Sequence, residues 1–313
     1  MKVDLRIIAD LSLVALAVAC TPQGKKTDEK AKEESVSVAD FKRVEPPTFI
    51  VEPQGRADYL VIHFWDNFDF SDTMYCHAPN ITEQAFVNFI ALFQHASREK
   101  VSEGVDKLMT NAEADVVMYN YFFRQAEHYL YEPNSPMRND EYYIPFLEHV
   151  VNAPIVKDVY KIRPKHLLEI AYRNRLGTKA LNFTYTMASG QTGNLYGIKA
   201  PYTVILFFNP GCTECQRTIE MLKNSPALAA AVTSGKAKIL AVYPDKDLAK
   251  WREHLDEVPP TWINGYDKSL DIKEKEIYDL KAIPTLYLLD KDKTVILKDT
   301  STGEIQEFFD KSK

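Results

Sequence analysis

Cysteine is scarce in this sequence, which has four cysteines among 313 residues. Four are too few for the dense disulfide framework of a small secreted scaffold, so each cysteine needs its own explanation. Basic stretches are missing as well: the formal net charge is −6, and lysine and arginine form no continuous stripe. Proteins that bind nucleic acid present such a stripe to the phosphates. We therefore set the nucleic-acid-binding class aside.

Apolar residues, by contrast, make up 45% of the sequence. A chain of this length and composition can bury substantial hydrophobic cores. Single cores stop growing at about 250–300 residues, beyond which chains divide into domains. We therefore expect two folded domains.

Two of the cysteines, Cys212 and Cys215, stand where a strand meets a helix. Residues 202–208 are mostly β-branched or aromatic, which predicts a buried strand, and a proline–glycine pair ends it. The apolar residues after the cysteines recur at helical spacing. The sequence thus predicts a strand, a sharp turn and a helix, with Cys212 at the start of the helix.

This position lets the two sulfurs form and break a bond with little backbone movement. Residues three apart at a helix start lie on one face, and a disulfide joins Cα atoms about 5–6 Å apart. The free N–H groups of the first turn favour the thiolate of Cys212. Cys212 is therefore the expected attacking sulfur and Cys215 the expected resolving sulfur. A permanent structural disulfide and half of a zinc site remain as alternatives, although zinc normally needs four ligands.

A second stretch, residues 282–298, predicts a hairpin that begins with a proline. An apolar strand starts at Ile283-Pro284-Thr285, residues 291–293 form the turn, and the partner strand follows. Proline is allowed at the first residue of a strand, and a cis bond before proline is usually retained for a reason. A plain turn proline is the alternative.

Together these residues resemble the thioredoxin superfamily, which combines a strand, a CxxC pair on a helix and Ile-Pro-Thr at the head of an antiparallel hairpin. The resemblance implies that Pro284 is cis and packs against the cysteines, and that Ile283 offers its backbone to the substrate. It implies no cofactor beyond a redox-active disulfide between Cys212 and Cys215. The implied partners are protein thiols and disulfides and an upstream thiol electron donor.

Residues 181–313 as a whole resemble the periplasmic TlpA/ResA branch of that superfamily, in which a hairpin precedes the first core strand. A hairpin signal is present at 182–198. Strands that alternate with helices predict an α/β sheet with helices on both faces. The remaining expected elements are a strand and three helices, at 237–243, 246–255, 273–278 and 303–309.

The sequence departs from its relatives around the cysteines. Thr213 and Glu214 lie between them, and we expect both to support substrate binding. Because a carboxylate beside the sulfurs disfavours a thiolate, Glu214 favours a reductant or isomerase over a strong oxidant. ResA relatives carry a glutamate three residues after the second cysteine, where this chain has Thr218. Asn209 stands where a peroxidase needs Thr or Ser, and the cysteine spacing is wrong for a copper chaperone, although His254 lies downstream.

The N-terminus predicts a lipoprotein. A cationic start and an apolar run reach Cys20, and the run is too short to cross a bilayer comfortably, which favours a signal peptide over residues 1–20. Residues 16–20 resemble a bacterial lipobox, which implies that Cys20 is lipidated; an ordinary secretory signal or an internal helix is the alternative. Residues 21–44, mostly polar and charged, predict a disordered tether. The resemblance implies a lipid-anchored, extracytoplasmic protein, at the periplasmic face of the outer membrane.

Residues 45–180 predict a domain that is mostly α-helical, because apolar residues recur at helical spacing in five segments. These are Ile81–Arg98, Val101–Met109, Asn111–Tyr131, Glu141–Asn152 and Val156–Leu176. The part from about Pro46 to Leu181 resembles a domain of unknown function that precedes thioredoxin-like modules in lipoproteins of anaerobic Gram-negative gut bacteria. The resemblance is carried by residues 65–69 and by the downstream stretch 262–267. The aromatic-rich stretch 58–70 imitates a thioredoxin strand, but no CxxC follows it.

This helical part shows no catalytic constellation. Cys76 adjoins a histidine, but adjacency does not bring thiol and imidazole face to face, and free cysteines are commonly buried. We expect Cys76 to lie in a core, and we expect the same of the aromatic residues Tyr119, Tyr121, Phe122, Phe123, Tyr129 and Tyr131.

The whole sequence predicts a membrane-tethered thiol–disulfide oxidoreductase that reduces or isomerises disulfides of extracytoplasmic proteins. The alternative is a lipoprotein binding module. In that case the disulfide only braces the fold, and the helical part docks a partner or a glycan.

Overall fold

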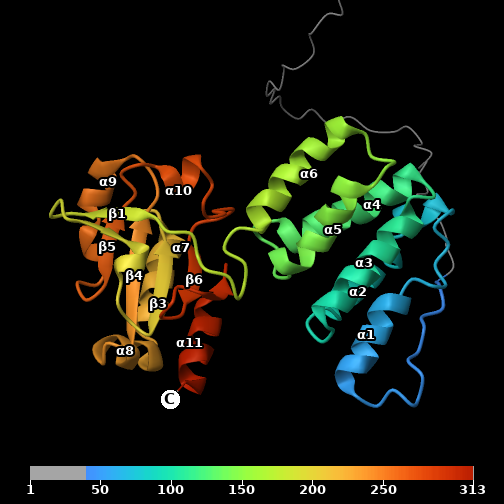
Figure 1. Ribbon diagram of the computed structural model, residues 1–313, viewed down its shortest axis with the longest axis horizontal. Coiled ribbons are helices and arrows are strands. Elements are labelled where there is room, and N and C mark those ends of the chain that lie inside the picture. Colours follow the sequence, from blue (N-terminus) through green and yellow to red (C-terminus); the bar gives the residue numbers. More distant parts are fainter. Residues whose placement is uncertain (1–39, 313) are drawn as a thin grey trace, which may run out of the picture. The chain divides into compact units, whose positions relative to one another are not determined.

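The computed structural model describes residues 40–312. The predicted signal peptide 1–20, the lipidation site Cys20 and most of the predicted tether 21–44 lie outside the described residues. Within residues 40–312, no helix is both long and apolar enough to cross a lipid bilayer. Along this part of the chain, six α-helices come first, and a seven-stranded sheet with its own helices follows (Figure 1).

The helices of the first part are α1 (Pro53–His63), α2 (Thr82–Ala91), α3 (Arg98–Ala112), α4 (Val116–Ala126), α5 (Asp140–Asn152) and α6 (Asp158–Ala171). Ser97, Asp115 and Asn139 accept hydrogen bonds from backbone N–H groups in the first turns of α3, α4 and α5. Such caps satisfy N–H groups that have no partner inside the helix. The cap at Asp115 explains why α4 starts later than the predicted segment, which begins at residue 111.

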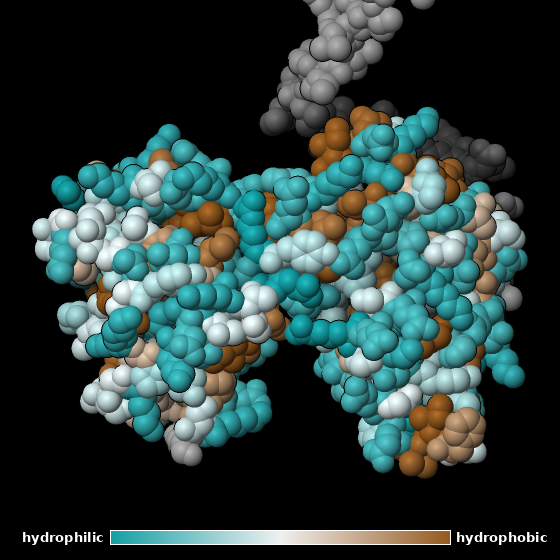
Figure 2. Space-filling view, in the orientation of Figure 1, coloured by the Kyte–Doolittle hydropathy of each residue, from teal (hydrophilic) through white to brown (hydrophobic). Residues whose placement is uncertain are grey.

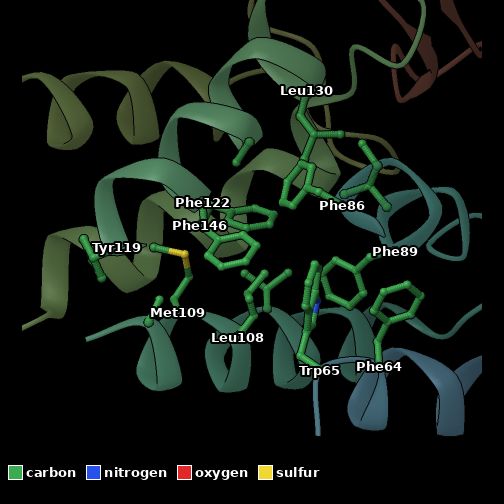
Figure 3. Packing of buried hydrophobic residues seen from close by; sticks show 14 of the residues in the cluster. Phe64, Trp65, Phe86, Phe89, Leu108, Met109, Tyr119, Phe122, Leu130 and Phe146 are labelled. Carbon is green, nitrogen blue, oxygen red and sulfur yellow. The ribbon is translucent and has the colours of Figure 1, made fainter. Parts of the chain in front are cut away.

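One core rich in aromatic residues holds these helices together, and Figure 3 shows part of it. The Trp65 ring meets Phe122 and Phe89 edge to face, with centroids 5.0 and 5.8 Å apart. Large aromatic side chains bury more apolar area than any others and gain from this geometry. Gly104 lets α3 approach α1 closely, because a Cβ there would lie 2.6 Å from the Val61 carbonyl oxygen.

The core role predicted for the aromatic residues of 119–131 is confirmed. Tyr119 and Phe122 are buried, and the other four pack against the same core while half-buried. Cys76 is also half-buried there, with its sulfur 3.7 Å from the Met118 sulfur. Burial raises the pKa of the Cys76 thiol, so this cysteine is a poor nucleophile.

Two local features of the first part differ from the predicted segments. The helix α1 occupies the first half of the aromatic-rich stretch 58–70, where no helix is predicted, and Pro53 stands at its first position, which suits proline. A turn of π-helix, Glu127–Tyr131, continues α4.

The helix α6 leaves an apolar face exposed. Figure 2 shows brown, hydrophobic atoms over this helix on a surface that is otherwise largely hydrophilic. The exposed large apolar side chains of α6 are Val159, Tyr160 and Ile162, and Ile155 precedes them. The opposite side of α6 contributes Leu167 and other residues to the helical core.

The sheet of the second part has the strand order β2-β1-β5-β4-β3-β6-β7. The central strands β3, β4 and β5 are parallel, β6 runs antiparallel to β3, and β6 and β7 form the predicted hairpin. The strand β1 pairs antiparallel with both β2 and β5. The bounds are β1 (Thr184–Met187), β2 (Thr192–Asn194), β3 (Tyr202–Phe207), β4 (Ala237–Tyr243), β5 (Ile263–Tyr266), β6 (Thr285–Leu289) and β7 (Val295–Lys298).

Alternate side chains of β3 face two different cores, as the period of a strand requires. Val204 and Leu206 belong to the core shared with α7 (Thr213–Lys223), α8 (Pro226–Thr233) and α11 (Thr302–Lys311). Ile205 and Phe207 belong to the core of the other face, which includes Ile272 of α10 (Asp271–Glu274). The α/β architecture with helices on both faces, predicted from the sequence, is confirmed.

Three elements of this part differ from the prediction. The helix α8 and the strand β5 are not predicted; β5 contains Asn-Gly, which has little strand propensity, and its neighbours β4 and β1 supply the pairing. The helix predicted at 273–278 is instead α10, because Leu270 and Glu276 adopt positive φ angles of 62° and 49° on either side of it. The helix α9 (Leu248–Glu253) lies inside its predicted segment.

Candidate functional site

The two cysteines Cys212 and Cys215 lie at the junction of β3 and α7. After β3 the chain turns at Gly211, whose φ of +69° is a conformation that glycine adopts without strain. Cys212 is the N-cap residue of α7, with extended backbone angles, and Cys215 lies in the first helical turn. The free N–H groups of that turn therefore lie next to the Cys212 side chain.

The two thiols differ in exposure. Cys215 is fully buried, whereas Cys212 is half-buried and reachable from solvent. Both thiols are free: the Cys215 sulfur accepts a hydrogen bond of 3.3 Å from the Asn209 N–H, and a hydrogen bond with the Cys212 sulfur favours the protonated form of Cys215. Burial raises the pKa of Cys215 to about 12; the Asn209 N–H opposes this, and Cys212 and Glu257 add to it. Cys212 is thus the sulfur that an incoming disulfide meets first.

The proline-headed loop lies beside the cysteines. The Ile283–Pro284 peptide bond is cis, and the next residue, Thr285, pairs across the sheet with Phe207 at the end of β3. Ile283 and Cys212 both pack, half-buried, against the apolar core that contains Cys215. The proline loop and the cysteine turn thus follow neighbouring ends of the paired strands β3 and β6, and Ile283 and Cys212 border the same core.

Thr213 and Glu214 are both exposed to solvent. The Glu214 side chain is 65% exposed and has one distant ion pair, 3.8 Å from Arg217. Water screens a charge in such a position. The carboxylate that raises the pKa of Cys215 is Glu257.

Glu257 lies in a short 3-10 helix, Leu255–Glu257, and His254 is the residue that ends α9 just before it. The sequence pattern relates His254 to the cysteines only as a metal ligand with the wrong cysteine spacing, and it does not relate Glu257 to them. One Glu257 oxygen accepts a hydrogen bond of 3.1 Å from the Gly211 N–H. The other lies 2.6 Å from Nε2 of Gln216 and 2.8 Å from Nδ1 of His254. No local signal could have found them, because 41 residues separate Glu257 from Gln216.

A buried ionic cluster holds the segment that leads into the proline loop. The Lys281 ammonium, three residues before Pro284, lies 2.7 Å from an Asp140 oxygen and 2.8 Å from an Asp279 oxygen. The second Asp140 oxygen lies 2.8 Å from the Lys298 ammonium. Burial opposes the charge on Asp140, but the two ammonium groups outweigh it and lower its pKa to about 2.

Among residues 40–312, no cluster of three or more histidine, cysteine or carboxylate side chains has the geometry to hold a metal ion. The chemistry that this arrangement offers is that of two thiols of unequal exposure, close enough to bond with each other.

Two family models match the sequence: that of a domain of unknown function (DUF5106) matches residues 19–174, and one described as thioredoxin-like matches residues 201–295. A crystal structure of a thioredoxin-like protein from Bacteroides caccae is 46% identical, covers 88% of this chain and 100% of that chain, and has a TM-score of 0.85.

Other solved structures cover less than half of this chain. The C-terminal domain of an uncharacterized protein from Bacteroides fragilis is 51% identical and covers 44% of this chain and 98% of that chain, with a TM-score of 0.43. The thioredoxin domain of a thiol-disulfide oxidoreductase from Bacteroides vulgatus is 20% identical and covers 44% of this chain and 97% of that chain, with a TM-score of 0.40. No curated protein matches the chain.

Proposed function

The chain belongs to the thioredoxin-like proteins, and on that premise we propose that it is a membrane-tethered thiol–disulfide oxidoreductase. Its substrates are disulfides of extracytoplasmic proteins, which it reduces or isomerises. The observation that carries this proposal is the pairing of a reachable Cys212 with a buried Cys215, next to the Ile283–Pro284 loop.

The reaction proceeds in two exchanges. The Cys212 thiolate attacks one sulfur of the substrate disulfide, forms a mixed disulfide and releases the other substrate sulfur as a thiolate, which takes up a proton. The Cys215 thiol then loses its proton and attacks the Cys212 sulfur, which releases the second substrate thiolate. Two electrons pass from the two protein thiols to the substrate, and a dithiol protein must reduce the Cys212–Cys215 disulfide afterwards.

The reducing or isomerising direction is part of the proposal. A strong oxidant owes its potential to a reduced form that its site stabilises as a thiolate. Burial keeps the Cys215 thiol protonated, so Cys212 is the position at which the redox potential is set, and the equilibration with glutathione measures it.

The tether is the second element of the proposal. We place the lipid on Cys20 and the folded part in the periplasm, at the outer membrane, because residues 16–20 resemble a lipobox and the following residues are polar. Fractionation of cells that express the wild type or Cys20→Ala tests this. The wild type is expected in the membrane fraction and the variant in the soluble fraction; wild-type protein in the soluble fraction would refute the anchor.

Reduction of insulin tests the enzymatic part. The wild type should reduce insulin in the presence of dithiothreitol, Cys212→Ala should be inactive, and Cys215→Ala should accumulate mixed disulfides that gel analysis can trap. Cys76→Ala is the matched control, because it removes a thiol of the helical core that is distant in sequence from Cys212 and Cys215. This variant should retain full activity. A wild-type protein that is inactive, with a disulfide that resists dithiothreitol, would support the binding module instead.

A further inference from the structure

The second exchange requires a proton acceptor near Cys215. This thiol must lose its proton before it can attack the Cys212 sulfur, and its full burial disfavours the thiolate. A positioned side chain that accepts the proton in the transition state can accelerate such a step by about 10²–10⁴-fold.

The Glu257 carboxylate is placed to act on the cysteine pair from both of its ends. Its oxygens accept hydrogen bonds from the Gly211 N–H and the Gln216 side chain, the residues that directly flank the CxxC segment. The carboxylate is 13% exposed. Burial raises the pKa of Glu257, but the bonds from Gln216, Gly211 and His254 outweigh burial and lower it, so the group is ionised at neutral pH.

His254 completes the arrangement. Because Glu257 is ionised and only accepts, Nδ1 of His254 carries the proton of their 2.8 Å hydrogen bond, and Nε2 is left free. That edge of the ring lies at the cysteine turn: a Cβ at Gly211 would be 3.1 Å from Nε2. Other titratable groups near the pair are Lys250 of α9, the two cysteines at the start of α7, and the side chains of Glu220, Lys223 and Asp256, which line the same surface hollow as Glu257.

We propose that Glu257 and His254 form the acid–base pair of the redox site, and that Glu257 is also the positioning residue of the cysteine turn. The pair takes the proton from Cys215 as its sulfur attacks Cys212, and the departing substrate thiolate takes that proton. The bond between Cys212 and the substrate sulfur breaks as the Cys212–Cys215 bond forms. This inference rests on the proposed function.

A route to solvent supports this role. Glu257 lines a surface hollow of about 440 Å³ together with Gln216 and Asp256. Protons held by the pair can therefore exchange with bulk water while the sulfurs are covered by a substrate.

The test separates the two exchanges with 5,5′-dithiobis(2-nitrobenzoate) as the disulfide. In stopped-flow mixing with the reduced protein, the attack of Cys212 releases one coloured thiolate, and resolution by Cys215 releases the second. Glu257→Gln keeps the shape of the side chain without its charge, and His254→Asn keeps a donor toward Glu257 but cannot titrate. Glu220→Gln is the matched control, because Glu220 lines the same hollow and bonds neither flank of the CxxC segment.

We expect Glu257→Gln and His254→Asn to slow the second phase at least about tenfold and the first phase far less. Glu257→Asp should recover part of the rate, and Glu220→Gln should match the wild type. A second phase that is unchanged or faster in both variants overturns the inference, and so does equal slowing of both phases. If the wild type releases no coloured thiolate through these cysteines, the proposed function fails, and the inference falls with it.

Discussion

Asp140 offers a sharp test of how the helical part supports the redox site. This first residue of α5 forms ion pairs of 2.7 and 2.8 Å with Lys281 and Lys298, and all three side chains are at most 6% exposed. Lys281 lies three residues before Pro284. We predict that Asp140→Asn destabilises the protein and also slows its reaction with disulfides.

The expected loss of stability follows from the contacts that remain. Removal of one partner from a buried ion pair costs about 3–5 kcal/mol, because the other charge stays buried without compensation. Lys281 keeps Asp279 at 2.8 Å, and the Lys298 ammonium still donates to two main-chain carbonyl oxygens. We therefore expect Asp140→Asn to lower the free energy of unfolding by about 3 kcal/mol, the lower end of that range.

The same carboxylate makes stability depend on acid pH. Its pKa is about 2 in the folded protein, against 3.8 as the ordinary value. A group whose folded pKa is lowered stabilises the protein fully above the unfolded pKa, and the contribution disappears as the pH falls through the folded value. In the wild type about 2.5 kcal/mol should therefore be lost progressively between about pH 5 and pH 1, below both pKa values, and this loss should be missing in Asp140→Asn.

Urea denaturation at pH 7 measures the loss of stability in Asp140→Asn, and the same measurement along the acid range measures how stability depends on pH. Asp66→Asn is the matched control, because Asp66 also has two partners, Lys107 and His63, but is about one-third exposed. The Asp66→Asn variant should lose less than about 1 kcal/mol of unfolding free energy. If Asp140→Asn costs no more than this control, the ionic cluster does not hold the proline loop and the reasoning is refuted.

Two glycines give further predictions. Gly211→Ala should cost about 1–3 kcal/mol, because alanine is strained at a φ of +69° and its Cβ would press on His254; the first phase of the stopped-flow reaction should slow, and an unchanged rate would contradict the turn geometry. Gly104→Ala should cost about 1–3 kcal/mol in urea denaturation, because the new Cβ would force α3 away from the Val61 backbone. Since Gly104 lies far along the chain from the cysteines, this variant should keep the wild-type rate of Cys212 attack under native conditions, and a slowed attack would count against a local effect.

The junction of β3 and α7, which carries the two cysteines, can be predicted from the sequence because the signals for it are local. A run of strand-forming residues, Pro-Gly and a helical pattern predict β3, the turn and α7 within a few residues, and Ile283-Pro284-Thr285 followed by two apolar runs predicts the β6–β7 hairpin. Each signal concerns the conformation of the segment that carries it. The fold class follows from the alternation of such segments.

Residues that act through tertiary contacts leave no such signal. Glu257 reaches the cysteine turn across 41 residues of sequence, and Asp140 reaches Lys281 across 141. The strand β5 forms around Asn-Gly because β4 and β1 flank it, so its own propensity does not reveal it. The aromatic stretch 58–70 shows the opposite case: its pattern is typical of a strand, but part of it forms the helix α1.

Redox equilibration of the cysteine pair tests the central claim most directly. The protein is incubated in buffers of graded reduced and oxidised glutathione, free thiols are alkylated, and mass spectrometry quantifies the bond between Cys212 and Cys215. We predict a reversible two-electron transition with a midpoint well below the roughly −120 mV of the strong oxidant DsbA. A pair that never forms the bond, a bond that glutathione and dithiothreitol cannot reduce, or a midpoint near −120 mV would contradict the account.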